Sequence, residues 1–325
     1  RMAVLDVGLV TTDQTAESII ERCRVLDVKL VTLSVARMAG FEENHAPDLS
    51  AMRTLQGKLA DSGITIAAMN QWVGSDQRGG PEAAMVENPS AHRREIDGQL
   101  RTTEVQGELG ISQQLHYIDT PLPADPAKDE LYWTNLTDIV GELSSQAEVS
   151  EVRIGHHGIW RCLTNELRDQ AISEGVTEAE YRQYLRYDQH GHPGWRGPYL
   201  VRKADDVRRL ADSNPNPYHG ITMCTGMYIT GAEPVIEIPK FAGRINFVQI
   251  RDLDARWPAA REVFPGTGNL DFKEILRQLL RAGYSGFLHP EHLGNPRWSG
   301  EDQVLEATKV LKTWVDEVEG EAEFQ

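Results

Sequence analysis

Four apolar segments in the second half of the chain each end in side chains that can bind a metal ion or move a proton. They read GHHG, MCTGM, FVQIRD and FLHPEH, and their polar residues are His156, His157, Cys224, Gln249, Arg251, Asp252, His289, Glu291 and His292. An imidazole, a thiolate, an amide oxygen and a carboxylate form a mixed donor set that suits a divalent transition metal with open positions. These four segments therefore hold candidate ligands of a metal site, provided that the fold brings the segment ends together.

Each of these residues also has an ordinary structural explanation. A histidine at a strand end commonly forms a hydrogen bond within the core, and a lone buried cysteine commonly packs as a small hydrophobic residue. Gln249 and Arg251 are two positions apart, so they share one face of a strand while Ile250 takes the other face. The occurrence of such residues at four successive segment ends is what favours a metal site.

The elements that must position these residues alternate along the chain. Short apolar runs alternate with amphipathic stretches, which is the pattern of βα units and a parallel sheet. Strands are predicted at residues 2–8, 30–35, 64–69, 113–118, 152–156, 220–224, 245–250 and 286–289. Helices are predicted at residues 15–26, 49–61, 93–109, 131–146, 204–212, 233–241, 272–282 and 302–318. Eight such units predict one α/β domain over residues 1–325, a closed (β/α)8 TIM barrel, with an open sheet as the alternative.

In a TIM barrel the C-terminal ends of the strands meet at one mouth, where active sites lie. The four motifs follow the predicted strands five to eight, so they would converge there. Two long segments, residues 71–88 after strand three and residues 159–203 after strand five, are expected to line or cover this mouth. Further candidate substrate-binding residues lie at the end of strand four and in the fifth loop: His116, Trp160, Arg161, His190 and Arg196.

The composition argues against several classes of partner. The formal net charge of −16 argues against nucleic acid, because binding to a phosphate backbone needs a basic surface. The sequence has no run of 18 apolar residues, so no membrane-spanning helix is predicted. Three scattered cysteines and an N-terminus without a signal-peptide pattern predict a cytoplasmic protein. The expected partner is a small molecule, and a homo-oligomer is compatible with the sequence.

The stretch from Gly220 reads GITMCTGMYITGAEPVIEIPKFAGRINFVQIRDL, and the stretch from Arg93 reads RREIDGQLRTTEVQGELGISQQLHYID. Both resemble mannonate dehydratases, which are sugar-acid lyases of the xylose isomerase-like barrel superfamily. Those enzymes carry Cys-Thr-Gly after strand six, His-Phe-Arg-Asp after strand seven and Arg-Pro-Asp-His after strand eight. The likeness covers much of residues 90–295, and Cys-Thr-Gly is its most specific piece.

The resemblance implies a metal site, usually for Mn²⁺, with Mg²⁺, Co²⁺ or Zn²⁺ as alternatives. In the family, two histidines, the cysteine and an aspartate hold the metal, and the matching positions here are His157, Gln249, Cys224 and Glu291. Gln249 therefore replaces a histidine with a neutral, harder and weaker ligand. Glu291 replaces the aspartate with a side chain that is one methylene longer.

The resemblance also implies an activity, which is the dehydration of a mannonate-like aldonic acid to a 2-keto-3-deoxy acid. Arg251 would bind the substrate carboxylate, and His292 or His289 would remove the α-proton or protonate the leaving hydroxyl. His289 stands where the family usually has an arginine. A metal-dependent sugar isomerase or epimerase is the first alternative, although such relatives generally supply a carboxylate after strand five. A non-catalytic barrel that has lost its metal is the second alternative, and Gln249 favours it.

Overall fold

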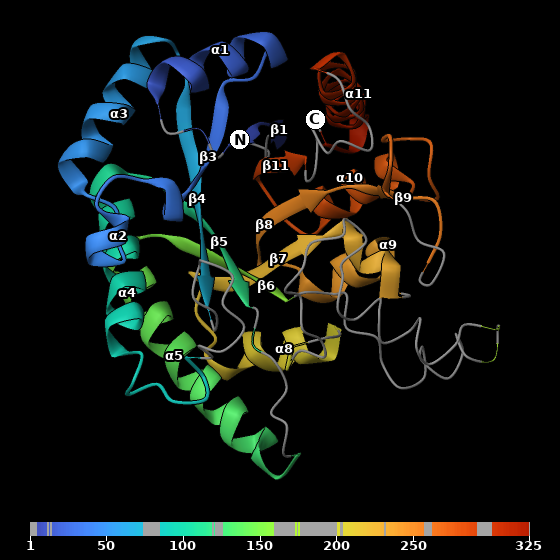
Figure 1. Cartoon of the computed structure of the whole chain (residues 1–325). Coiled ribbons are helices and arrows are strands. Elements are labelled where there is room, and N and C mark those ends of the chain that lie inside the picture. Colours follow the sequence, from blue (N-terminus) through green and yellow to red (C-terminus); the bar gives the residue numbers. More distant parts are fainter. Residues whose placement is uncertain are drawn as a thin grey trace.

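Parallel strands in the computed structural model form a nearly closed barrel with helices around its outside (Figure 1), which confirms the predicted TIM barrel. The structure describes residues 5–11, 13, 15–73, 85–118, 120, 126–158, 173, 175, 200–201, 204–230, 232–256, 262–290 and 301–324. The strands pair in the order β1-β11-β8-β7-β6-β5-β4-β3-β2. They are β1 (Leu5–Val7), β2 (Leu9–Thr11), β3 (Leu30–Ser34), β4 (Thr65–Val73), β5 (Gln113–Ile118), β6 (Arg153–Gly158), β7 (His219–Cys224), β8 (Ile245–Ile250) and β11 (Gly286–Pro290).

The first strand of the barrel is divided at Gly8, and this division lets the ring close. β1 pairs with β11 on one side, whereas β2 pairs with β3 on the other. A Cβ atom at position 8 would clash with the ring of Phe287 and with the carbonyl oxygen of Leu30. Only glycine therefore fits where the strand changes partner. The sequence predicted one strand that ended at residue 8, and it did not predict the continuation as β2.

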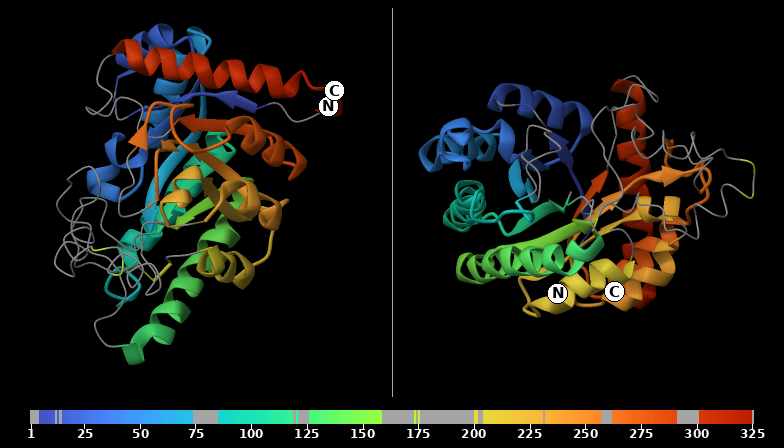
Figure 2. Two further views of the ribbon diagram at one scale, coloured as in Figure 1. Left: turned by 90° about the vertical axis from the view of Figure 1, so that its right-hand side faces the viewer. Right: turned by 60° about the horizontal axis from the view of Figure 1, so that its bottom comes forward.

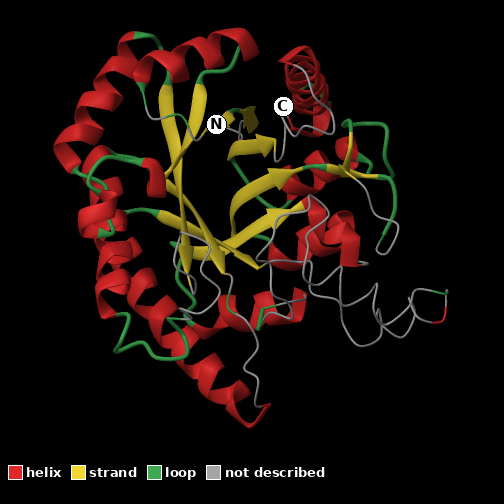
Figure 3. Ribbon diagram, viewed as in Figure 1, coloured by secondary structure: helices red, strands yellow, loops and turns green. Residues whose placement is uncertain are grey.

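The helices surround the strands (Figure 3), and three of them begin at a side chain that accepts a hydrogen bond from a free backbone N–H group. The side chains of Thr15, Asp48 and Asp271 accept hydrogen bonds from the first turns of α1, α3 and α10. The longer helices are α1 (Ala16–Leu26), α3 (Leu49–Asp61), α4 (Arg93–Leu109), α5 (Asp129–Ser150), α8 (Ala204–Ser213), α10 (Phe272–Arg281) and α11 (Glu301–Glu319). The short helical segments are α2 (Phe41–Asn44), α9 (Pro234–Glu237) and the 3₁₀ helices η1 (Val35–Arg37), η2 (Pro126–Lys128), η3 (Thr225–Thr230), η4 (Ile238–Phe241) and η5 (Ala322–Phe324).

Hydrophobic side chains pack both inside the barrel and between the barrel and its helices. Inside, Ala68, Leu115, Phe247 and Phe287 form one cluster, and the two phenylalanine rings lie 5.6 Å apart between centroids. Outside, larger clusters join the strands to the helices. Because both faces of each strand are buried, the strands lack an alternating polar pattern, as parallel sheets usually do.

A small hairpin follows β8 and was not predicted. Its strands β9 (Asp252–Leu253) and β10 (Glu262–Val263) pair antiparallel, and each is two residues long. Strands this short show no periodic pattern in a sequence. The hairpin brings Glu262 close to the end of β8, although eleven positions separate it from Arg251.

The two long segments expected at the mouth lie mostly outside the described residues. β4 extends to Val73, so the segment after it begins later than the predicted residue 71. Of residues 159–203, the structure describes 173, 175, 200 and 201.

The last long helix, α11, packs against α1 and α10 and covers β1 (Figure 2). None of the helices in the described ranges is long and apolar enough to cross a membrane.

Candidate functional site

Three candidate residues lie side by side at the C-terminal ends of neighbouring strands. Cys224 on β7 is opposite Gln249 on β8, and Gln249 is opposite His289 on β11. All three side chains are buried, and neighbouring strands lie about 4.8 Å apart. Phe247 and Phe287, two residues earlier on β8 and β11, fill the barrel interior. Because side chains alternate along a strand, Gln249 and His289 also point into the barrel, one layer closer to its mouth.

Tyr117 connects this row to the fourth candidate residue, His157. The Nε2 atom of Gln249 donates a hydrogen bond to Oη of Tyr117 at 3.0 Å and lies 3.4 Å from Nδ1 of His289. The rings of Tyr117 and His157, which are opposite each other on β5 and β6, lie 5.2 Å apart between centroids. The Oε1 atom of Gln249 is buried and has no hydrogen-bond partner within the described part of the chain. The structure thus places His157, Gln249 and His289 around one interior region, and strand register puts Cys224 beside Gln249 at its edge.

Each residue of the Cys-Thr-Gly motif has a separate role in building this region. Cys224 ends β7 in register with Gln249. The hydroxyl of Thr225 donates to the carbonyl oxygen of Arg251 at 2.7 Å and accepts from its backbone N–H at 2.8 Å. A Cβ atom at Gly226 would clash with the guanidinium of Arg251, so any larger residue would displace this side chain from its present position. The motif at the end of β7 therefore fixes both the backbone and the side chain of Arg251.

The guanidinium of Arg251 forms a buried ion pair with the carboxylate of Glu262 on β10. Arg251 is 2% exposed and Glu262 is 5% exposed. The sequence analysis did not predict the role of Glu262, because the hairpin that brings it to Arg251 has no sequence signal. A substrate carboxylate that binds Arg251 would therefore share this guanidinium with Glu262.

Asp252 holds the glycine-rich turn FPGTGN and leaves it no role in phosphate binding. Its Oδ2 atom accepts hydrogen bonds from the N–H groups of Gly266 and Gly268, each at 2.9 Å. Burial raises the pKa of the Asp252 carboxyl, and the backbone hydrogen bonds act in the opposite direction. The backbone amides that a phosphate would need are already bound to a carboxylate of the chain itself.

His116 lies on the outer face of the barrel, away from the other candidates. Leu115 belongs to the interior cluster and Tyr117 contacts Gln249, so the residue between them points outward. The His116 ring lies 5.3 Å from the His156 ring, which lies 4.8 Å from the His219 ring. These three buried residues form an outer histidine cluster. The sequence had placed His116 among the candidate substrate-binding residues, but in the structure this residue lies on the outer face of the barrel.

The outer histidine cluster consists of rings that stay neutral near pH 7. Burial lowers the pKa of His116 to about 3, and the neighbouring His219 lowers it further. Burial also lowers the pKa of His219 to about 4, although its Nδ1 atom lies 2.6 Å from the carbonyl oxygen of Asn214, which acts in the opposite direction. These rings pack within the outer face and are unsuited to proton transfer at neutral pH.

The remaining candidate residues lie outside the part of the chain that the structure describes. They are Glu291, His292, Trp160, Arg161, His190 and Arg196. Among the described residues, no group of three or more histidine, cysteine, aspartate or glutamate side chains is placed to hold a metal ion. The expected ligand set is compatible with this result, because its third member is the amide of Gln249 and its fourth is Glu291.

The chain belongs to the xylose isomerase-like TIM barrel family, whose model matches residues 36–314. Within that class, its relatives include mannonate dehydratases. One from Thermotoga neapolitana is 28% identical over 135 residues, which cover 36% of this chain and 36% of the relative. Another from Enterococcus faecalis is 32% identical over 156 residues, which cover 40% of this chain and 43% of the relative. The matches thus span less than half the length of these relatives.

Solved structures share the fold over nearly the whole chain. A mannonate dehydratase from Streptococcus suis serotype 2 has a TM-score of 0.66 at 15% identity and covers 98% of this chain and 94% of its own. The IOLI protein with a binding zinc atom has a TM-score of 0.63 at 14% identity, with 96% and 97% covered. D-psicose 3-epimerase from Clostridium cellulolyticum H10, solved with D-tagatose, has a TM-score of 0.64 at 13% identity, with 96% and 99% covered.

Proposed function

We propose that this protein is a metal-dependent hydro-lyase that converts a mannonate-like aldonic acid into a 2-keto-3-deoxy acid and water. The observation that carries the proposal is the row of Cys224, Gln249 and His289 inside the mouth of the barrel, with His157 linked to it through Tyr117. The relatives named mannonate dehydratase support the substrate class.

The residues of this row fit a divalent cation. A buried amide oxygen without a hydrogen bond costs about 1–3 kcal/mol, and a cation at Oε1 of Gln249 would remove that cost. His157, Cys224, Gln249 and Glu291 would hold the ion, and Mn²⁺ is the proposed one. The chemistry that a bound divalent cation supplies is the stabilisation of negative charge on a substrate oxygen.

Arg251 would orient the substrate by binding its carboxylate. Its backbone is already held by two hydrogen bonds with Thr225, and its side chain by the space over Gly226 and by the carboxylate of Glu262. A guanidinium held in this way loses little further freedom when the substrate binds. Arg251 would therefore require the substrate carboxylate to lie at one position, in addition to requiring its negative charge.

His289 is suited to hydrogen bonding with the leaving hydroxyl. The side-chain nitrogen of Gln249 can only donate, so Nδ1 of His289 accepts and the proton of the neutral ring lies on Nε2. The ring would donate a hydrogen bond from Nε2 to the leaving hydroxyl, and the proton that turns this hydroxyl into water would come from the group that has removed the α-proton. The α-proton would be removed by a second group, for which His292 remains the candidate.

A sugar isomerase or epimerase is the second candidate function. The buried pairing of Arg251 with Glu262 favours it, because Glu262 already neutralises the guanidinium that an acidic substrate would need. His289 in place of the family's arginine also leaves less positive charge at the mouth. An uncharged sugar would bind such a site without competing with a carboxylate.

Metal analysis followed by a substrate screen tests the proposal. Protein purified without chelator should contain about one equivalent of a divalent cation, and hexonic acids should yield a 2-keto-3-deoxy product. Cys224→Ala should lose the metal and the activity while the fold remains intact. Cys23→Ala is the matched control, because Cys23 is also a buried cysteine but lies on α1. Turnover of free sugars alone would favour the isomerase, and wild-type protein without metal would favour the non-catalytic barrel.

The substrate carboxylate is tested separately with Arg251→Ala. The variant should lose activity on aldonic acids by about 10²-fold or more, because it removes a charge-assisted clamp. Equal loss on neutral sugars would contradict a role for Arg251 in binding a carboxylate.

A further inference from the structure

We propose that Tyr117 and His289 are positioning residues, which hold the amide of Gln249 so that its oxygen and not its nitrogen is offered to the cation. The inference rests on the proposed function, because it presupposes a cation beside Gln249. It adds a role for Tyr117, whose position inside a strand gave no functional signal in the sequence.

The geometry accounts for both hydrogens of the Gln249 amide nitrogen. A glutamine side chain has two N–H donors and one oxygen acceptor. The Nε2 atom lies 3.0 Å from Oη of Tyr117 and 3.4 Å from Nδ1 of His289, and both atoms can accept. The nitrogen is thus engaged on two sides, whereas the oxygen has no hydrogen bond from any described residue.

The opposite orientation of the amide would defeat ion binding. Turning the amide over would present an NH₂ group, which has no lone pair for a cation and carries partial positive charge. It would also give up the two hydrogen bonds of Nε2 unless Tyr117 and His289 both became donors. Because Gln249 is 0% exposed, water does not replace those bonds. Tyr117 and His289 therefore determine which atom of Gln249 faces the ion.

This arrangement explains how a glutamine can stand where the related enzymes have a histidine. An imidazole presents its nitrogen by the orientation of its ring, whereas an amide needs neighbours that distinguish oxygen from nitrogen. An amide oxygen is also a harder donor than an imidazole nitrogen. Relative to a site with histidine at this position, the site should prefer Mn²⁺ or Mg²⁺ over Zn²⁺.

Equilibrium dialysis with Mn²⁺ tests the positioning role without any substrate. Tyr117→Phe should weaken Mn²⁺ binding by about 10- to 100-fold, which is the usual effect of removing a residue that orients a ligand. Tyr284→Phe is the control, because Tyr284 is a buried tyrosine whose hydroxyl donates to the carbonyl oxygen of Phe287 and not to Gln249. The control variant should bind Mn²⁺ as the wild type does.

A double-mutant cycle separates a role through Gln249 from a general loss of stability. Gln249→Leu should weaken Mn²⁺ binding, and adding Tyr117→Phe to it should cause no further loss. An additional loss in the double variant would overturn the positioning role. Wild-type affinity in Tyr117→Phe would overturn this inference while leaving the proposed function in place. Wild-type protein that binds no Mn²⁺ would overturn the proposed metal site itself.

Discussion

At the residue scale, the surroundings of Arg251 show how several elements fix one side chain. Thr225 bonds its backbone on both sides, Gly226 leaves space for its guanidinium, and Glu262 neutralises its charge. A buried ion pair adds little net stability compared with hydrophobic residues, but removing one partner is expensive. Glu262 is therefore expected to matter for stability and for the orientation of Arg251.

Glu262→Gln should lower the free energy of unfolding by about 3–5 kcal/mol, because the guanidinium of Arg251 would remain buried without its counter-charge. Urea denaturation measures the change. Glu317→Gln is the control, since Glu317 pairs with Lys273 at 2.6 Å on an exposed surface. The control should change stability by less than about 1 kcal/mol. Similar losses in both variants would show that the Arg251 pair is not effectively buried.

Gly226→Ala should destabilise the protein by about 1–3 kcal/mol, because the added Cβ atom would press against the guanidinium of Arg251. Gly57→Ala provides the contrast. Gly57 is exposed on α3 and has open space around its Cα atom, so alanine there should stabilise by about 0.5–1 kcal/mol. Thermal unfolding should show a lower Tm for Gly226→Ala and a higher Tm for Gly57→Ala than for the wild type. An unchanged Tm for Gly226→Ala would contradict the close packing of Arg251.

At the element scale, the sequence predicted the main helices and strands well and the fine structure of the barrel poorly. Strands at residues 113–118 and 245–250 and helices at residues 49–61 and 93–109 have the predicted bounds. Their apolar periodicity and their glycine or aspartate caps are local signals. The break at Gly8 and the β9–β10 hairpin depend on contacts with Phe287 and Arg251, which are distant in sequence or lie across a turn.

The alternation of side chains along β5 decides which residues face the barrel interior. This alternation separates His116 from Tyr117, but no feature of the sequence indicates which face is the inner one. Both faces are buried in a parallel barrel, so polarity does not distinguish them. Tyr117 was missed for the same reason, since an aromatic residue inside a strand is usually part of the core. The arrangement of Glu291 and His292 stays a prediction, because both lie outside the described residues.

The outer histidine cluster predicts a loss of stability in mild acid. The pKa of His116 is about 3 in the folded chain and about 6.5 when unfolded, so the unfolded state binds more protons between these values. The contribution of the neutral His116 ring to the free energy of unfolding is fully present above about pH 6.5. Below that pH it falls by about 1.4 kcal/mol per pH unit. His116→Leu should reduce the slope of the unfolding free energy against pH, by up to about 1.4 kcal/mol per pH unit between pH 6 and pH 4. Parallel curves of unfolding free energy against pH for the wild type and the variant would contradict the prediction.

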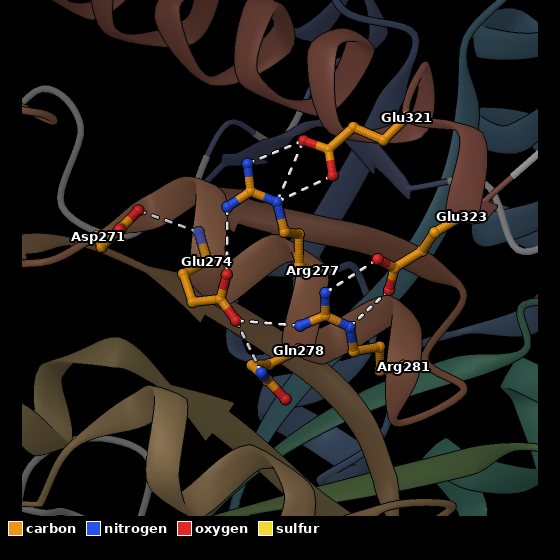
Figure 4. A network of polar contacts seen from close by, with 7 residues as sticks. All are labelled: Asp271, Glu274, Arg277, Gln278, Arg281, Glu321 and Glu323. Atoms are coloured by element: carbon orange, nitrogen blue, oxygen red, sulfur yellow. Dashed lines mark hydrogen bonds and ion pairs between the residues drawn. The ribbon is translucent and has the colours of Figure 1, made fainter.

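At the scale of the whole molecule, two arginines of this acidic chain join the segment after α11 to α10. The net charge is −16, yet Arg277 and Arg281 on α10 both lie between acidic residues (Figure 4). Arg277 pairs with Glu321 at 2.8 Å, and Arg281 pairs with Glu323. Glu274 contacts both arginines from the same helix. These bonds join α10 to the segment after α11. The helix α11 itself packs against β1, at the place where the ring closes.

Two opposing effects decide how the stability of the protein changes when Glu321 and Glu323 are neutralised. Removing negative charge from an acidic protein relieves repulsion, whereas losing two ion pairs costs about 0.2–1 kcal/mol for each pair. The distances at Arg277 and Arg281 are short and the pairs share Glu274, so the local loss should be larger. Glu321→Gln combined with Glu323→Gln should therefore destabilise by about 1 kcal/mol in 0.05 M salt and by much less in 1 M salt.

The control is Glu148→Gln on α5, which removes one negative charge from an exposed residue with no ion-pair partner in the described ranges. It should leave stability unchanged or raise it slightly at low salt. Urea denaturation of the three proteins at both salt concentrations makes the comparison. If the double variant were more stable than the wild type at low salt, relief of the net charge would outweigh the contacts of Arg277 and Arg281. The C-terminal network would then be a consequence of surface crowding rather than a source of stability for the barrel.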